Sequence, residues 1–251
     1  MIPDTSSRTL SIPLSLVAAL LLWHLTVRWS SLPAFILPAP GRVGLRLLDV
    51  LRNGSLLYHT LVTLNEILMG LMLGLSAAFS LGYALAKSPR LERFLAPYLV
   101  ASQATPMVAI APLLVIWLGP GMGVKVLICA LIVFFPVLVN TIVGVRSVPA
   151  ELHTLMRSLR ASRWQTFRLL ELPAALPVLL GGLRVGATLS VIGAVVGEFM
   201  GADRGLGFLV NLGRGQYDTA LVFVAVGTLI ALALMLYAAV LLLERRAINH
   251  R

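Results

Sequence analysis

Several long runs of apolar residues restrict the possible folds of this chain more than any other feature. A helix needs roughly 20 predominantly apolar residues to cross the hydrocarbon core of a bilayer, and several runs reach that length. Hydrophobic residues make up 59% of the chain and charged residues 12%, whereas soluble domains average about 25% charged residues. We therefore expect an all-α membrane protein rather than a water-soluble globular domain.

Turns and charged segments divide the apolar sequence into six expected spans within one transmembrane domain, residues 1–251. The expected spans are residues 12–29, 57–86, 94–118, 124–144, 175–201 and 219–243. Six spans place both termini on one side of the membrane. If that side is the cytoplasm, the cytoplasmic segments hold most of the lysines and arginines, as the positive-inside rule requires. We therefore expect both termini to be cytoplasmic.

The formal net charge of +10 does not indicate a nucleic-acid partner, because the basic residues are spread over short segments between apolar runs. One cysteine, Cys129, and four scattered histidines form no local metal-ligand pattern. The glycine-rich segment before Lys125 lacks the second glycine and the Ser or Thr of a phosphate-binding loop. We expect no catalytic residue, metal or cofactor in this chain, so any ATP must be bound by another protein.

Residues 145–174, which we call the elbow, are both charged and helix-forming. Arginines outnumber acidic residues in the elbow. A first amphipathic helix is predicted to open at Pro149, where a missing N–H costs nothing. Its apolar residues recur at the spacing of one helical face: Leu152, Leu155, Met156 and Leu159.

A second helix of the elbow is predicted to open at Ser162, with Gln165 three residues later at the spacing of a capping box. Trp164 and Phe167 lie on its apolar face, and Pro173 marks its expected end. Two amphipathic helices between membrane spans indicate a docking surface for a soluble partner. The positive-inside rule alone would also enrich arginine here, and the two aromatic rings could pack on span ends, so this alternative stays open.

Polar and helix-breaking residues inside the expected spans mark a candidate solute pathway. In the third span, Pro97, Pro106 and Pro112 are expected to break the helix, and the freed carbonyls need protein or cavity water. The prolines, like the glycines of the fifth span, also fit ordinary helix packing. The candidate pathway residues are Glu66, Gln103, Thr105, Pro106, Asn140, Arg184, Ser190 and Glu198.

Glu66 lies deep in the second span, where a carboxylate costs about 2.5–3.5 kcal/mol on insertion scales. Arg184 or Arg52 is its expected ion-pair partner. Glu198 lies near the end of the fifth span, and there we expect it to reach water.

Five segments resemble binding-protein-dependent ABC transporter permeases, most closely the sulfonate, taurine and nitrate importer group, which also includes permeases for pyrimidine precursors and riboflavin. Their order and spacing agree with the family over nearly the whole chain. The segments are residues 37–43 (LPAPGRV), 106–121 (PMVAIAPLLVIWLGPG), 134–148 (FFPVLVNTIVGVRSV), 158–184 (SLRASRWQTFRLLELPAALPVLLGGLR) and 195–210 (VVGEFMGADRGLGFLV).

The resemblance implies the type I ABC importer permease fold, with six transmembrane helices, in the bacterial plasma (inner) membrane. It implies a homodimer, two ABC ATPase subunits that bind ATP and Mg²⁺ and grip the elbow, and an external, periplasmic substrate-binding protein. The implied function is the permease subunit of an ATP-driven importer, itself not an enzyme. Its solute would be sulfonate-, taurine- or nitrate-like, or a pyrimidine- or riboflavin-type vitamin compound.

Family members carry Glu-Ala-Ala, three further residues and Gly-Ala in the elbow, and residues 154–156 and 160–161 occupy these positions here. If the backbone at Arg160 is left-handed, arginine costs roughly 1–2 kcal/mol there. The residues that the resemblance and the helix pattern implicate in coupling to the ATPase are Glu151, Met156, Leu159, Arg160, Ala161, Ser162, Trp164, Phe167 and Pro173.

Two other classes of membrane protein are alternatives to an ABC importer permease. An ion-coupled secondary carrier that works without an ATPase would need inverted repeats and intramembrane acidic pairs. No internal repeat is visible, and Glu66 is the one acidic residue expected at depth. A membrane-embedded enzyme would need clustered histidine, cysteine or acidic residues. Co-purification of an ATPase with this chain would separate these classes.

Overall fold

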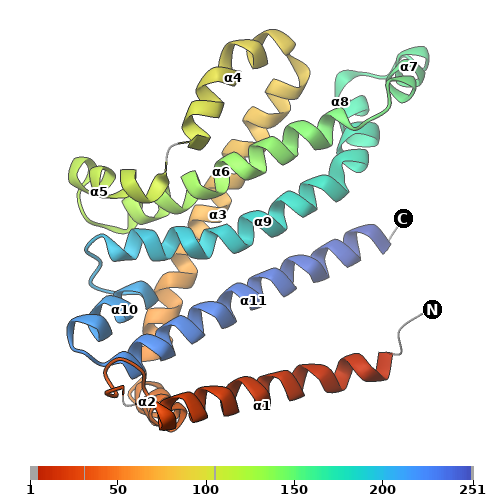
Figure 1. The fold of residues 1–251 in the computed structure, drawn as a ribbon. Coiled ribbons are helices and arrows are strands. Elements are labelled where there is room, and N and C mark those ends of the chain that lie inside the picture. Colours follow the sequence, from red (N-terminus) through yellow and green to blue (C-terminus); the bar gives the residue numbers. More distant parts are fainter. Residues whose placement is uncertain (1–4, 31, 105, 250–251) are drawn as a thin grey trace.

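The computed structural model describes residues 5–30, 32–104 and 106–249, and within these ranges every regular element is a helix (Figure 1). The expected all-α fold is therefore confirmed. In chain order the elements are α1 (Thr5–Trp29), α2 (Pro40–Arg52), α3 (Ser55–Lys87), α4 (Pro89–Ala104), α5 (Met107–Leu118), α6 (Met122–Arg146), α7 (Ala150–Ser158), α8 (Arg163–Thr166), the π-helical segment η1 (Phe167–Glu171), α9 (Leu172–Phe199), α10 (Leu206–Gly215) and α11 (Thr219–Asn249).

Four helical stretches of the described chain are long and apolar enough to cross a membrane. They are α3, α6, the stretch Arg163–Phe199 that joins α8 to α9, and α11. They coincide with four of the six expected spans. The expected first span lies in α1, whose apolar part, Val17–Trp29, is shorter than these four.

The expected third span, 94–118, is two helices rather than one. Helices α4 and α5 meet at a break with a 94° bend, and together they count as one further candidate span. Pro106 lies at this break as the N-cap of α5. A proline has no backbone N–H, so it cannot make the hydrogen bond that would continue α4 through this position. Pro97 and Pro112 lie inside α4 and α5, so the expectation that all three prolines break the span is wrong.

Helix α6 packs between α3 and α9, and glycines bring the three backbones close together. A Cβ added at Gly70 of α3 would lie 2.5 Å from the Cβ of Cys129. A Cβ added at Gly193 of α9 would lie 2.6 Å from the Cα of the same cysteine. Small residues at such positions let transmembrane helices approach closely. Figure 1 shows α6 and α9 side by side, with α11 next to α9.

The elbow lies at one end of this bundle, and α2, α5 and α10 lie toward the other (Figure 1). The described beginning of α1 and end of α11 point toward the elbow end. Pro173 does not end the second elbow helix, contrary to expectation. The chain continues from α8 through η1 into α9, because a π turn replaces i−4 bonds by i−5 bonds, as in the bond from the Leu172 N–H to the Phe167 carbonyl.

Candidate functional site

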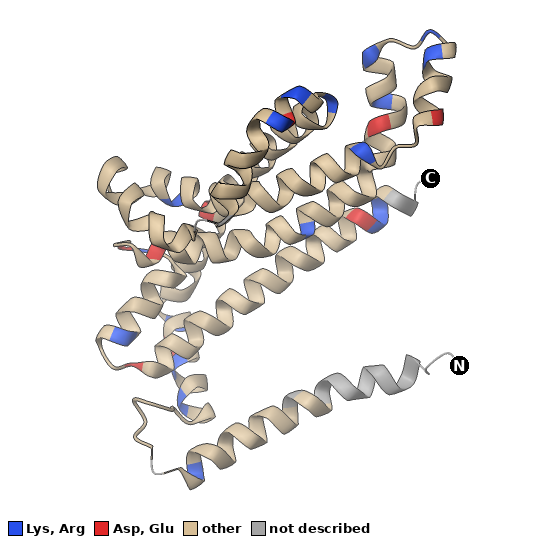
Figure 2. Cartoon of the chain, turned by 45° about the horizontal axis from the view of Figure 1, so that its top comes forward, with Lys and Arg blue, Asp and Glu red and all other residues tan. Residues whose placement is uncertain are grey.

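The first helix of the elbow, α7, begins one residue later than predicted, with Pro149 as its N-cap. Its apolar face points away from the bundle. Leu155 is 53% exposed and Leu159 is 68% exposed, and Leu152 is also exposed. Figure 2 shows lysine and arginine positions, in blue, along the ribbon of this protruding tip. An exposed apolar face beside arginines is the composition of a protein-docking surface.

The turn after α7 is a Schellman motif with arginine at the position that usually holds glycine. Arg160 has a φ of 50°, in the left-handed region. The Arg160 N–H donates to the Arg157 carbonyl at 2.9 Å, and the Ala161 N–H donates to the Met156 carbonyl at 3.0 Å. Arg160 therefore has the left-handed backbone that was considered for it, and the cost of about 1–2 kcal/mol for a residue other than glycine applies.

The predicted capping box at the start of α8 is present. The Gln165 N–H donates to the Ser162 hydroxyl at 3.2 Å, and the Ser162 N–H donates to the Gln165 side-chain oxygen at 2.7 Å. Trp164 is 65% exposed, whereas Phe167 is half-buried, and its ring centre lies 5.2 Å from that of Tyr83 in an edge-to-face contact. The elbow thus presents Trp164 outward and anchors on α3 through Phe167.

The remaining candidate coupling residues fall on the same protrusion. Glu151, Arg160 and Ser162 are exposed, and Met156 and Ala161 are half-buried. Pro173 lies in the first turn of α9, at the base of the elbow rather than on its tip. The structure therefore brings the coupling candidates together at one end of the bundle, with Pro173 set back from the others.

Three of the pathway candidates line one cavity of about 620 Å³ beside the break between α4 and α5. Gln103 and Pro106 contribute from the break, and Asn140 contributes from α6 together with Phe135. The Asn140 amide also donates to the Pro136 carbonyl at 2.8 Å. Thr105 lies outside the described residues. A cavity that combines amide groups with an aromatic ring can hold a small polar solute.

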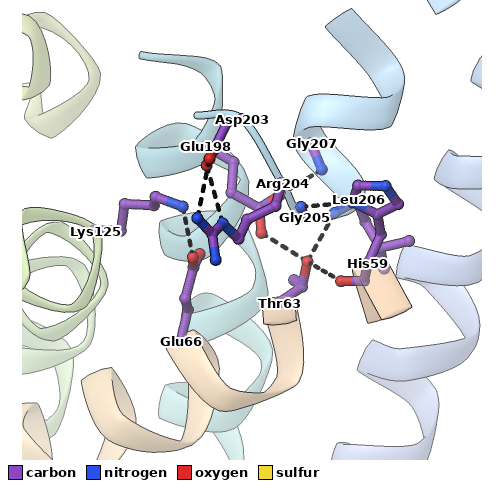
Figure 3. A network of polar contacts seen from close by, with 10 residues as sticks. All are labelled: His59, Thr63, Glu66, Lys125, Glu198, Asp203, Arg204, Gly205, Leu206 and Gly207. Atoms are coloured by element: carbon purple, nitrogen blue, oxygen red, sulfur yellow. Dashed lines mark hydrogen bonds and ion pairs between the residues drawn. The ribbon is translucent and has the colours of Figure 1, made fainter. Parts of the chain in front are cut away.

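Glu66 forms a buried ion pair with Lys125 (Figure 3). The Lys125 Nζ lies 2.7 Å from Glu66 Oε1, and the two residues are 7% and 0% exposed. The expected partners, Arg184 and Arg52, are wrong: Arg184 pairs with Glu244 of α11. Lys125 lies at the start of the expected span 124–144, and α6, which begins at Met122, places it in the first helical turn, against Gly197 of α9. The signal in the sequence that could have identified this partner is a lysine at the start of an apolar run.

Glu198 is also fully buried, so the expectation that it reaches water is wrong. Its carboxylate accepts a hydrogen bond from the Thr63 hydroxyl at 2.6 Å and another from the Gly207 N–H (Figure 3). The Thr63 oxygen in turn accepts from the Leu206 N–H at 2.8 Å. A carboxylate and a hydroxyl therefore satisfy N–H groups that open α10.

The loop before α10 ends at Gly205, and the geometry there requires a glycine. Gly205 has a φ of 112°, and a Cβ added there would lie 2.1 Å from Glu198 Oε1. Its N–H donates to His59 Nδ1 at 2.9 Å. In the exposed part of this loop, the hydrogen bond from Arg204 holds the pKa of Asp203 below its usual range. The bond to His59 ties the loop to α3.

Ser190, the remaining pathway candidate, is buried within α9. Its hydroxyl donates to the Ala187 carbonyl at 2.7 Å, and its own carbonyl accepts from the Cys129 thiol at 3.3 Å. Ser190, Glu66 and Glu198 are packed between helices rather than lining the cavity at Gln103, Pro106 and Asn140.

Comparison with known proteins identifies the family. Residues 70–249 match the family described as binding-protein-dependent transport system inner membrane component. The riboflavin transport system permease protein RibX of Chloroflexus aurantiacus is 49% identical over 94% of this chain and 88% of its own length. The formylaminopyrimidine transport permease protein ThiX of Halalkalibacterium halodurans is 35% identical over 90% of this chain and 89% of its own. The taurine transport system permease protein TauC of Escherichia coli is 30% identical over 96% and 90%.

Two solved structures share the fold at low sequence identity. A chain of the inward-facing MetNI methionine ABC transporter has a TM-score of 0.62 and 18% identity, covering 77% of this chain and 94% of its own length. A chain of an amino acid ABC transporter crystallised with histidines has a TM-score of 0.65 and 16% identity, covering 80% and 97%. The expected type I ABC importer permease fold is therefore confirmed. The chain belongs to the binding-protein-dependent transport system inner membrane components, and it is the multi-pass permease component of an ABC importer rather than an enzyme.

Proposed function

We propose that this permease imports a heteroaromatic vitamin compound, of the riboflavin or pyrimidine-precursor type, as a homodimer with two ATPase subunits. Members of the family work with an ATPase and a substrate-binding protein. The relative named for riboflavin transport is 49% identical, and the one named for taurine transport is 30% identical. This difference favours a vitamin-type solute over a sulfonate.

The observation that carries the coupling mechanism is the exposed apolar face of α7 beside the exposed Trp164. Removing large apolar side chains of this kind from water contributes about 25 cal/mol per Å² of apolar surface, and the part that exceeds the ordering cost of association stabilises the complex. The arginines that surround the face would pair with acidic groups of the partner. In this proposal the ATPase binds ATP and Mg²⁺, grips the elbow from the cytoplasm, and moves it during hydrolysis.

The cavity at Gln103, Pro106 and Asn140 is the proposed passage for the solute. Amide groups such as those of Gln103 and Asn140 both donate and accept hydrogen bonds, as the ring edge of a pyrimidine or flavin requires. Phe135 supplies an aromatic face for a planar ring. The break between α4 and α5 lies at this cavity, and irregular backbone at membrane depth is tolerated where it lines such a cavity.

Uptake by proteoliposomes tests the proposal. The permease is reconstituted with its ATPase, and its substrate-binding protein is loaded with labelled riboflavin, formylaminopyrimidine or taurine. We expect ATP-dependent and vanadate-sensitive uptake of a vitamin compound. Uptake of taurine alone would overturn the substrate class, and uptake without the ATPase would overturn the mechanism.

A substitution in the elbow tests the docking role. Ala161→Glu puts a bulky charge in the turn between α7 and α8, and we expect uptake to fall at least about tenfold, equivalent to about 1.4 kcal/mol. ATP hydrolysis and dimer assembly should persist. Ala161→Ser, which keeps the residue small, is the matched control and should import normally. Unchanged import by Ala161→Glu would contradict a docking role for the elbow.

A further inference from the structure

We propose that Glu171 is the positioning residue through which the elbow moves the membrane helices. Glu171 is the last residue of η1, the π-helical segment that connects the elbow to α9. Short π segments inside α-helices occur frequently at functional sites. The inference rests on the proposed coupling role of the elbow and names the contact that would transmit its movement.

Three side chains from two other elements meet the Glu171 carboxylate. The Tyr83 hydroxyl of α3 donates to Glu171 Oε2 at 2.9 Å, and the Lys87 ammonium, one turn later in α3, donates to Glu171 Oε1. His153 Nδ1 of α7 lies 3.7 Å from the same Oε1. One carboxylate therefore joins both helices of the elbow to the end of α3.

The Glu171 side chain is 4% exposed, whereas that of Lys87 is 39% exposed. A carboxylate at such depth is retained only where partners offset its desolvation. Lys87 also lies over the Tyr83 ring, 5.7 Å from its centre. The charged and aromatic groups thus form one unit whose geometry depends on the position of Glu171.

At its beginning the elbow is held by Arg146, which pairs with Glu92 of α4 and donates to the Leu85 carbonyl of α3 at 3.4 Å. Helix α7 makes few contacts with the other helices. Beside Glu171, a cavity of about 780 Å³ is lined by residues of both α3 and the elbow, among them Phe79, Tyr83, Trp164 and Phe167. The aromatic contact of Phe167 with Tyr83 is apolar and less directional than a hydrogen-bonded ion pair. A movement of α7 and η1 would therefore reach α3 through the hydrogen bonds of Glu171, whereas Arg146 holds only the start of the elbow, at the end of α6.

The experiment measures solute molecules imported per ATP hydrolysed by the reconstituted complex. Glu171→Gln keeps the size of the side chain and removes its charge. We expect the ratio to fall at least about fivefold, the lower end of the range for coupling between sites. ATPase binding and the melting temperature of the permease should stay close to wild type. If Glu171 had only a structural role, the melting temperature would fall and the ratio would not change.

Lys87→Met provides a second variant at a half-exposed position, in case Glu171→Gln assembles poorly. It should lower the ratio to a similar extent, and the double variant should be no worse than either single one, since both remove the same interaction. Arg90→Met, an exposed basic residue at the start of α4, is the matched control and should couple normally.

The outcomes separate the two proposals. If the wild-type complex shows no ATP-dependent uptake, the proposed function fails and this inference fails with it. If wild type imports and both Glu171→Gln and Lys87→Met keep its ratio, the proposed function stands and the role of Glu171 is overturned. Additive losses in the double variant would also overturn it.

Discussion

At the scale of single residues, Arg160 shows how a motif can change while its backbone geometry stays. The Arg160 and Ala161 N–H groups make the two hydrogen bonds of a Schellman turn. Glycine adopts the left-handed conformation of this turn without a steric cost, whereas arginine does not. Two hydrogen bonds and the capping box at Ser162 hold the turn in place.

Arg160→Gly should therefore stabilise the permease. The gain from relieving the left-handed arginine, about 1–2 kcal/mol, is partly offset by the greater freedom of glycine in the unfolded chain. We expect a small rise in the melting temperature in detergent. Ser158→Gly, in the last helical turn of α7, is the control and should lower it, because glycine inside a helix costs about 1 kcal/mol. A lower melting temperature for Arg160→Gly would argue against the left-handed turn.

At the scale of elements, buried polar contacts fix the positions of neighbouring helices along one another, which apolar packing alone specifies less strictly. The Glu66–Lys125 pair joins α3 to α6, and Glu198 joins α9 to Thr63 of α3 and to the beginning of α10. The glycines of α3 and α9 permit the close approach of α6. Removing one partner of a buried pair is costly because the other charge is left unpaired.

Lys125→Met should destabilise the permease by about 3–5 kcal/mol, because it leaves the Glu66 carboxylate buried without its cation. Adding Glu66→Gln should restore much of the loss, since no charge then remains unpaired. Both effects are measured as changes in melting temperature and in the yield of folded protein in detergent. Arg204→Met removes an exposed cation nearby and is the control. Equal stability of Lys125→Met and wild type would contradict the ion pair.

At the scale of the whole molecule, the elbow and the loop before α10 lie at opposite ends of the bundle (Figure 1). A helix bundle that crosses the membrane must then expose these two ends to different compartments. The positive-inside rule predicts that the arginine-rich elbow lies in the cytoplasm. We propose this orientation, in which the ends of α1 and α11 that point toward the elbow also lie on the cytoplasmic side.

Labelling with a membrane-impermeant maleimide checks this orientation. The native Cys129 is buried, so introduced cysteines can be read separately. Ser158→Cys in the elbow should react only in inside-out vesicles, and Asp203→Cys in the exposed loop should react only in intact cells or right-side-out vesicles. Cys129 alone is the background control. Labelling of Ser158→Cys from outside would reverse the topology and remove the elbow from the reach of a cytoplasmic ATPase.

The sequence alone determined the class of protein and the cap that opens the second helix of the elbow. An apolar run that spans a bilayer must satisfy its backbone hydrogen bonds internally, and a helix does so. This argument predicted α3, α6, α9 and α11. The capping box at Ser162 depends on residues three apart, and such local patterns can be read without the fold.

The tertiary structure decided which distant side chains meet. The partner of Glu66 is Lys125, 59 residues away, and Glu171 gathers Tyr83 and Lys87 across 88 and 84 residues. Pro173 continues a helix through a π turn, although proline usually ends one. Helix periodicity specifies the face on which a residue lies, but the identity of its neighbour depends on how the helices cross, and that is set by close packing of many side chains at once.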